Sequence, residues 1–267
     1  MAQTEIYYFS GSGNSLYVAK TLQKMLPGSS LFPIVRLFTQ KEVKLSPPSV
    51  GFVFPIHLST IPIFILDYIK TMDLSTTEYV FAIATRIGTQ HSAFSQLKKV
   101  IAAKGKKLNS AISLNMPSND PKFGFKAFSN EEINNQKLII NNKLLELASL
   151  INTKKDFLEE DTSFLTKIPF VNSIAWLVKL TDNIQQKFYT DKKCIGCGTC
   201  AQACPSGKII MKGDRPFWQK EIKCFKCNAC LNFCPKQAVQ IKGFTEGKDR
   251  YNHPYATVED IAQQKKN

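Results

Sequence analysis

The stretch Cys194-Ile-Gly-Cys-Gly-Thr-Cys-Ala-Gln-Ala-Cys204-Pro205 places four cysteines ahead of a proline. The same arrangement returns as Cys224-Phe-Lys-Cys-Asn-Ala-Cys-Leu-Asn-Phe-Cys234-Pro235, displaced by 30 residues at every cysteine. The displacement persists beyond the prolines, where apolar residues of one copy correspond to apolar residues of the other. All eight cysteines of the 267-residue chain lie in these two runs. The stretch is therefore an internal repeat built around its cysteines.

The spacing C-x₂-C-x₂-C-x₃-C-P is typical of the ligand runs of [4Fe–4S] clusters. Three thiolates at this spacing can hold one face of a cluster, and the fourth cysteine of each run ligates the other cluster. The proline cannot donate an N–H group and fixes φ, so it turns the chain away. We therefore expect two clusters, one held by Cys194, Cys197, Cys200 and Cys234, and the other by Cys224, Cys227, Cys230 and Cys204.

Structural zinc is the alternative, because paired C-x₂-C units also bind that metal. Zinc requires neither a third cysteine at the same spacing, nor the proline, nor the duplication. The pattern therefore favours iron–sulfur clusters and a chain that moves electrons. No cysteine is left over for a disulfide, which indicates a reducing cytoplasm. Clusters of this type are often damaged by oxygen, so an anaerobic host is plausible.

Composition allows a sizeable core and predicts a basic surface. Hydrophobic residues make up 43% of the chain, and the formal net charge is +14. We expect no signal peptide, because the N-terminus leads directly into a short strand with no charged start followed by a long apolar stretch. We expect no transmembrane segment either, because the most apolar window, 50–66, is interrupted by prolines and polar residues. Residues 191–243 hold ten Lys or Arg against three Asp or Glu, a local charge of +7. This excess either compensates cluster charge or docks an acidic redox protein, whereas scattered lysines argue against nucleic-acid binding.

A glycine- and serine-rich loop follows the first apolar strand, Ile6–Phe9. An amphipathic helical pattern begins after this loop and ends at Pro27-Gly28. Glycines allow a ligand to approach the backbone, serines offer hydroxyl groups, and a helix N-terminus offers unpaired N–H groups. The loop is therefore a candidate phosphate cradle, and an ordinary capped turn is the alternative. Its residues are Ser10, Gly11, Ser12, Gly13, Asn14 and Ser15.

Strands and helices alternate through the first half of the chain. Further strands are expected near Leu31–Val35 and at Val50–Pro55, Tyr79–Thr85 and Leu108–Met116. Helical patterns cover Ile61–Met72, Ala93–Lys104 and Asn130–Ile151, the last behind a capping box of Ser129 and Glu132. Such alternation predicts an α/β fold with a doubly wound, parallel, five-stranded sheet. Ligands of such sheets bind at the carboxyl ends of the strands.

Several stretches resemble a known family. The segment Tyr8–Ala19 is similar to the FMN-phosphate loop of flavodoxins, and nearly the whole chain resembles flavodoxin–ferredoxin fusion proteins. Met116-Pro-Ser-Asn119, Trp218 and the closing Arg250-Tyr-Asn-His-Pro254 also match that family. The resemblance implies a flavodoxin-like sheet, a small α+β ferredoxin-like domain with two clusters, and electron exchange between these clusters and FMN.

The loops expected to flank the flavin ring depart from the family, which usually carries tyrosines and glycines there. This chain instead has Pro55 and His57 in one loop, and Thr85, Arg86 and Gly88 in the next. His57 is a candidate stacking partner, and Arg86 a candidate neighbour of the pyrimidine edge. A loop-capping histidine and a solvated arginine are the alternatives.

These observations predict four segments: a flavodoxin-like FMN domain (1–152), a helical connector with an apolar stripe in Ile168–Leu180 (153–190), a tandem cluster domain (191–243) and a tail (244–267). We expect an electron-transfer protein that serves an acidic redox protein, such as a ferredoxin or flavodoxin, or a redox enzyme. The alternative is a flavin-dependent reductase that meets a small substrate at FMN and is fed by the clusters. Neither the donor and acceptor nor the oligomeric state follows from these residues.

Overall fold

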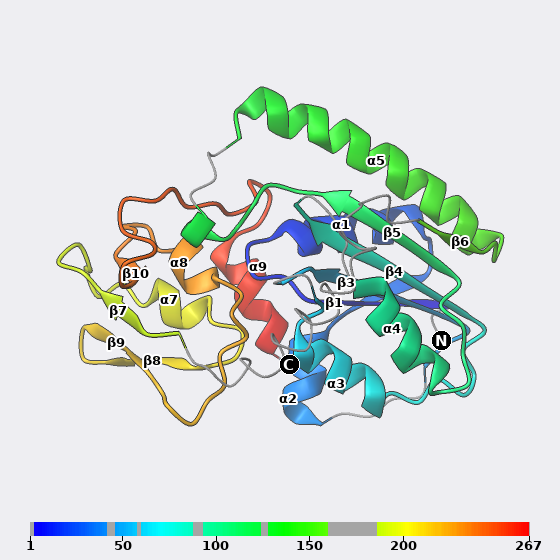
Figure 1. Cartoon of the computed structure of the whole chain (residues 1–267), viewed down its shortest axis with the longest axis horizontal. Helices are drawn as coiled ribbons and strands as arrows, with labels where there is room; N and C mark the ends of the chain where they lie inside the picture. The colour runs from blue at the N-terminus through cyan, green and yellow to red at the C-terminus, as the bar shows by residue number, and fades with distance from the viewer. Residues whose placement is uncertain are drawn as a thin grey trace, which may run out of the picture.

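The computed structural model describes residues 3–41, 46–57, 60–87, 93–123, 128–159 and 186–266. Its centre is a parallel sheet in the order β2-β1-β3-β4-β5-β6 (Figure 1). The strands are β1 (Thr4–Tyr8), β2 (Ser29–Pro33), β3 (Ser49–Pro55), β4 (Tyr79–Arg86), β5 (Ser110–Asn115) and β6 (Phe157–Leu158). The first five follow the flavodoxin-like order 2-1-3-4-5, whose switch point lies between β1 and β3.

The sheet confirms the predicted α/β class and differs in one strand. The sequence predicted five strands, and β6 adds a sixth by pairing with Ser110 and Ala111 of β5. The residues of β6 are exposed and too few to give a periodic apolar signal. The strand expected near Leu31–Val35 ends earlier, at Pro33, because Pro33 is the N-cap of a short helix, α2 (Ile34–Gln40).

Helices cover both faces of the sheet. Helix α1 packs against α5, and α3 contacts both α2 and α4 on the opposite face (Figure 1). The predicted capping box of Ser129 and Glu132 is present at the start of α5. The remaining bounds are α1 (Asn14–Met25), α3 (Ile63–Thr71), α4 (Ala93–Ala102), a short 3₁₀ turn η1 (Pro121–Phe123) and α5 (Asn130–Asn152).

The cysteine-rich repeat folds as two similar halves. Short helices α7 (Thr199–Gln202) and α8 (Ala229–Asn232) begin 30 residues apart, each after a left-handed residue. Strand β8 (Ile209–Lys212) pairs antiparallel with β9 (Arg215–Trp218). Strand β10 (Val239–Ile241) pairs with β7 (Phe188–Thr190). The repeat seen in the sequence is thus a repeat of helix and strand.

The predicted connector and the predicted tail both contain regular secondary structure. Strands β6 and β7 fall inside the stretch 153–190 that the sequence assigned to the connector, whereas its expected helix at 168–180 lies outside the described residues. The tail forms α9 (Val258–Ala262), which begins with a capping box of Thr257 and Asp260, and a 3₁₀ turn η3 (Gln263–Lys265). Figure 1 shows α9 between the parallel sheet and the cysteine-rich part. Within the described ranges, no helix is long and apolar enough to cross a membrane.

Close packing at the centre of the sheet gives a stability prediction. Gly51 in β3 pairs with Phe81 in β4, and a Cβ atom on Gly51 would overlap the Phe81 ring. We expect Gly51→Ala to lower the free energy of unfolding by about 1–3 kcal/mol, as overpacked cores do. Urea unfolding monitored by circular dichroism measures it.

The double variant Gly51→Ala/Phe81→Leu tests the cause. Because the smaller side chain vacates the overlapped space, the two changes together should cost less than the sum of each alone. Strict additivity would contradict the overlap as the source of the destabilisation.

Candidate functional site

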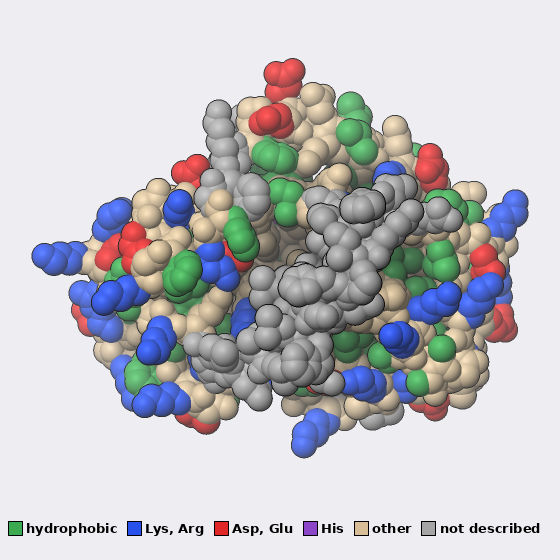
Figure 2. Space-filling model, in the orientation of Figure 1, with side chains coloured by type: hydrophobic (Ala, Val, Ile, Leu, Met, Phe, Trp, Pro, Cys, Tyr) green, Lys and Arg blue, Asp and Glu red, His purple; other side chains and the backbone are tan. Residues whose placement is uncertain are grey.

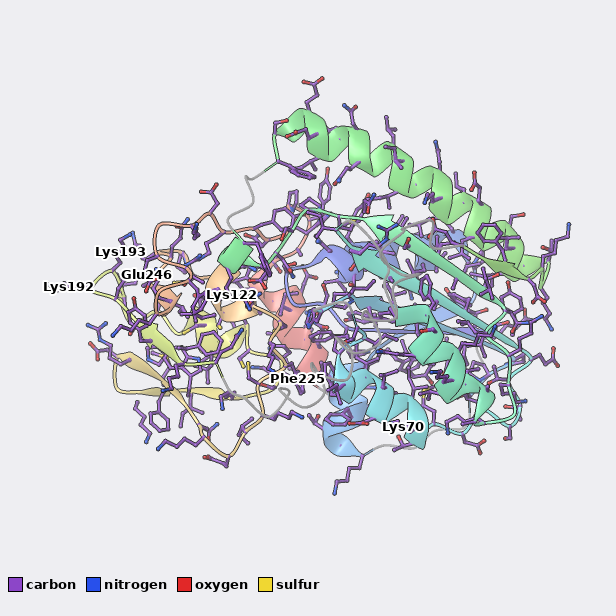
Figure 3. The ribbon with its side chains drawn as sticks, viewed as in Figure 1. Lys70, Lys122, Lys192, Lys193, Phe225 and Glu246 are labelled. Carbon is purple, nitrogen blue, oxygen red and sulfur yellow. The ribbon has the colours of Figure 1, made fainter. Side chains whose placement is uncertain are left out.

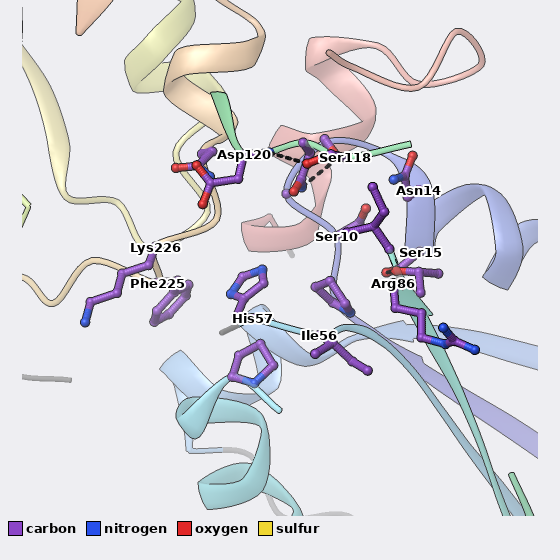
Figure 4. Close-up of a pocket in the computed structure, with 18 of the residues that line it drawn as sticks. Ser10, Asn14, Ser15, Ile56, His57, Arg86, Ser118, Asp120, Phe225 and Lys226 are labelled. Carbon is purple, nitrogen blue, oxygen red and sulfur yellow. Dashed lines mark hydrogen bonds between the residues drawn. The ribbon is translucent and has the colours of Figure 1, made fainter. Parts of the chain in front are cut away.

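A cleft of about 410 Å³ lies at the carboxyl ends of β1, β3, β4 and β5. Its walls come from the loops that follow these strands and from the second cysteine run, where residues 223–226 and Asn228 line it. Figure 4 shows the Phe225 ring beside His57, while the Lys226 side chain extends away from the imidazole. The position is the one expected for a ligand of a doubly wound sheet, since the switch point between β1 and β3 opens here.

The structure brings most of the predicted cofactor residues to this cleft. The residues that line it are Ser10, Gly11, Ser12, Asn14, Ser15, Pro55, His57, Thr85 and Arg86. Gly13 does not line the cleft: its φ is 100°, and a Cβ atom there would overlap Ala256 and lie 2.9 Å from the Cβ of His253. Gly88 lies outside the described residues.

The glycine–serine loop is held in one conformation by internal hydrogen bonds. The Gly13 N–H donates to Ser10 Oγ at 3.0 Å, and α1 begins at the next residue. The hydroxyls of Ser15 and Thr85 are 2.8 Å apart, so they join the loop to the end of β4. The Asn14 amide donates to the Pro117 carbonyl at 3.0 Å and joins it to the segment after β5. The start of α1 therefore faces the cleft as a fixed anion cradle.

Residues of the C-terminal tail hold the same loop in place through hydrogen bonds. The buried Gln264 side chain accepts a hydrogen bond from the Ser10 N–H at 2.9 Å and donates to the Ser10 carbonyl at 2.8 Å. The His253 N–H donates to the Ser12 carbonyl at 2.7 Å, and the Tyr251 hydroxyl donates to Asn14 Oδ1 at 3.0 Å. The loop therefore takes its shape from residues about 250 positions away in the chain.

His57 and Arg86 both line the cleft, but their side chains point in different directions. Burial, together with the charges of Lys122 and Lys226, lowers the pKa of His57 to about 4, so the imidazole is neutral at pH 7. Its ring meets Phe9 edge-on, with centroids 6.3 Å apart. The Arg86 side chain points away from His57 and Phe225 (Figure 4).

Three buried polar atoms of the cleft lack a hydrogen-bond partner among the described residues: Arg86 Nε, Gln186 Oε1 and Asn228 Oδ1. Buried polar groups are normally paired, so a donor and two acceptors without partners indicate a ligand that offers both kinds of group. The edge of a flavin ring offers both, and its phosphate suits the loop at α1. The cleft therefore fits a flavin.

The eight cysteines line two further, much smaller cavities of about 20 Å³ each. Four thiols face each cavity, and the fourth cysteine of each run faces the cavity of the other run. One cavity, which we call distal, is lined by Cys194, Cys197, Cys200 and Cys234. The other, which we call proximal because it borders the cleft, is lined by Cys204, Cys224, Cys227 and Cys230.

Cysteines of the same crossed set raise one another's pKa. Burial, together with the charge of Cys234, raises the pKa of Cys200 to about 11. Burial also raises the pKa of Cys227 and Cys230, and the charge of Cys204 from the other run adds to both shifts. Such thiols ionise together only when a metal compensates their charge.

The thiols do not converge on a single ion. Among the residues that the structure describes, no group of three or more His, Cys, Asp or Glu side chains could hold one metal ion. Zinc would require four ligand atoms within about 2.3 Å of one point. Four thiols spread around a cavity suit a polynuclear cluster instead.

The cleft and the proximal cavity share a wall. Cys224, Phe225 and Asn228 line both spaces. Phe225 stacks on Phe64 of α3, with ring centroids 4.0 Å apart and planes at 11°. Behind the cradle, a Cβ atom on Gly11 would overlap the carbonyl oxygen of Cys227. Side chains of the second cysteine run therefore form a wall common to the two spaces.

Comparison with protein families identifies the cysteine-rich part. Residues 193–239 match the model of the 4Fe-4S dicluster domain. No curated protein matches the chain. Together with the strand order of the sheet, the match shows that a flavodoxin-like domain and a 4Fe-4S domain are joined in one chain.

Solved structures resemble part of the chain at low identity. They include a Bacteroides uniformis protein described as a flavoprotein, with 18% identity, a TM-score of 0.34 and coverage of 44% of this chain and 92% of that one. The FMN-dependent NADH-azoreductase of Bacillus anthracis, in complex with FMN, has 13% identity, a TM-score of 0.34 and coverage of 54% and 99%. Rubredoxin oxygen:oxidoreductase of Desulfovibrio gigas has 12% identity, a TM-score of 0.35 and coverage of 57% and 37%.

Sequence reasoning missed two groups of cleft residues. The segment Met116–Asp120 follows β5 and lines the cleft. The strand-end rule could have placed it there, since the sequence predicted that strand. The other half of the molecule contributes Gln186, residues 223–226 and Asn228. Their position depends on how the halves pack, for which the sequence carries no local signal.

The tail contact gives a prediction about flavin binding. Gln264→Leu removes both hydrogen bonds to Ser10, and we expect the loosened cradle to bind flavin roughly tenfold more weakly. Gln263→Leu is the matched control, because the neighbouring Gln263 is exposed. Titration of the apoprotein by flavin fluorescence measures both dissociation constants. Equal affinities of the two variants would show that the tail does not support the cradle.

Proposed function

We propose that the chain is an electron-transfer protein that binds FMN in the cleft and [4Fe–4S] clusters in the two cysteine cavities, and that passes electrons between them for a redox partner. The flavin supplies two-electron chemistry, and each cluster supplies one-electron chemistry. The chain would thereby connect a two-electron donor or acceptor to a one-electron carrier.

The wall shared by the cleft and the proximal cavity carries this proposal. Electron transfer weakens steeply with the distance between cofactors, and here Cys224 lines both spaces. The stack of Phe225 on Phe64 fixes the second cysteine run against the sheet. Only the proximal cavity has this position, because no cysteine of the distal set lines the cleft.

The residues of each site suit the proposed groups. The N–H groups at the start of α1, with the hydroxyls of Ser10 and Ser12, would hold the FMN phosphate. Arg86, Gln186 and Asn228 would offer their unpaired atoms to the ring. Each cluster would take three thiolates from one run and the fourth from the other, as listed for the two cavities above.

Cofactor content tests the crossed assignment. Anaerobically purified protein should contain about eight irons and eight sulfides, and Cys204→Ser should reduce both to about four by removing a ligand of the proximal cluster. In that variant, reducing equivalents placed on the flavin should no longer reach the remaining cluster at the wild-type rate. Iron analysis, electron paramagnetic resonance and stopped-flow absorbance supply the three readouts.

Cys234→Ser is the matched variant for the distal cavity. It should lose the same amount of iron and keep fast exchange between the flavin and the proximal cluster. Loss of exchange in Cys234→Ser with retention in Cys204→Ser would reverse the assignment. Zinc in place of iron in the wild type, or turnover of a small substrate at FMN without any exchange with the clusters, would reject the proposed function.

A further inference from the structure

We propose that the surface over the distal cavity docks a small acidic redox protein, and that this carrier exchanges electrons with the chain through Cys197 and its neighbours. The inference rests on the proposed function, since it assigns the distal cluster as the exit of the electron path. We call this surface the distal face. It consists of residues 192–197, the turn between β8 and β9, and Lys236.

The distal cavity lies near the solvent, unlike the proximal one. Cys197 is exposed, whereas Cys204, Cys227 and Cys230 are buried. Ile195 stands between two cysteines of the distal set, and 61% of its surface is accessible. A carrier can therefore approach the distal set closely at Cys197 and Ile195, whereas three of the four proximal cysteines are buried.

Positive charge surrounds this exposed apolar centre. Figure 2 shows Lys and Arg side chains gathered over the cysteine-rich end, and Figure 3 places Lys192 and Lys193 at its tip, on the side away from Phe225. Within the described part of the chain, none of the basic residues of this face forms an ion pair with a carboxylate. They are Lys192, Lys193, Lys212, Arg215 and Lys236, all exposed.

The β8–β9 turn belongs to the same face. Gly196 lies against Asp214 of that turn, where a Cβ atom on Gly196 would be 2.7 Å from the Asp214 carbonyl oxygen. Lys212 and Arg215 flank the turn and are therefore close to the distal loop. A protein partner fits this composition better than nucleic acid, because Ile195 offers an apolar anchor and Asp191 and Asp214 interrupt the basic residues.

The lysines closest in sequence to the cysteines, which include Lys192, Lys193, Lys223 and Lys226, do not form one patch. Lys223 and Lys226 line the cleft, so a charge change there would disturb the flavin site. Lys192 and Lys193 belong to the distal face (Figure 3).

Each encounter with the carrier transfers one electron. The chain loses this electron and the carrier gains it, or the reverse. No bond or proton needs to move.

Charge reversal tests the distal face. The probe is a small acidic [2Fe–2S] ferredoxin, titrated calorimetrically at low and at physiological ionic strength. We expect wild-type binding to weaken as salt rises, because the Debye length falls to about 8 Å at 0.15 M. Lys192→Glu/Lys193→Glu should weaken binding at low salt roughly tenfold and flatten the salt dependence.

Lys98→Glu/Lys99→Glu is the matched control, since these adjacent lysines are exposed on α4 and the net charge changes equally. Its affinity should stay within about twofold of wild type, while Ile195→Ser should weaken binding and keep the salt dependence. Equal losses in both lysine pairs, no binding by wild type, or tighter binding of a DNA oligonucleotide or anionic vesicles would overturn the proposal. Iron, flavin and internal electron exchange, measured on the same samples, show whether the proposed function still stands.

Discussion

The second cysteine run packs directly against the glycine–serine loop and against helix α3, which covers one face of the parallel sheet. Gly11 leaves no room for a side chain beside Cys227, and Phe225 lies flat on Phe64. The aromatic contact continues to Phe9, whose ring meets Phe225 at 90°. Because both spaces share the wall formed by this run, the position of the flavin cleft and that of the proximal cavity are set by one interface.

The tail stabilises this interface from the other side. Gln264 holds Ser10 of the cradle, and the next residue, Lys265, donates to the carbonyls of Ala201 and Cys204 at 3.1 and 2.9 Å. Two adjacent side chains thus join the cradle to the first cysteine run. These contacts would have to break before the cleft could change its distance from the cysteine cavities.

Elements with a strong periodic or spacing signal were predictable from the sequence. The central strands are continuous apolar runs because both of their faces are buried, and the capping boxes of α5 and α9 mark helix starts with two residues each. The repeat of 30 residues predicted the two similar halves of the cysteine-rich part. Strand β6 escaped prediction because two residues that pair at a sheet edge need no particular side chains.

In the cleft, only the residues contributed by the parallel sheet were predictable from the sequence. The cradle and the strand-end residues follow from the topology of the sheet, since parallel strands bring their carboxyl ends together. Phe225, Asn228 and Gln264 reach the site through contacts between segments far apart in the chain. Such contacts depend on the shapes of two folded surfaces, and no short motif encodes them.

An iron anomalous difference map from crystals of the anaerobically isolated protein tests the central claim most directly. The account predicts two iron peaks, with the peak nearer to the flavin held by Cys204, Cys224, Cys227 and Cys230 behind the wall of Cys224 and Phe225. A flavin far from both peaks, or one next to the peak held by Cys194, Cys197, Cys200 and Cys234, would contradict it.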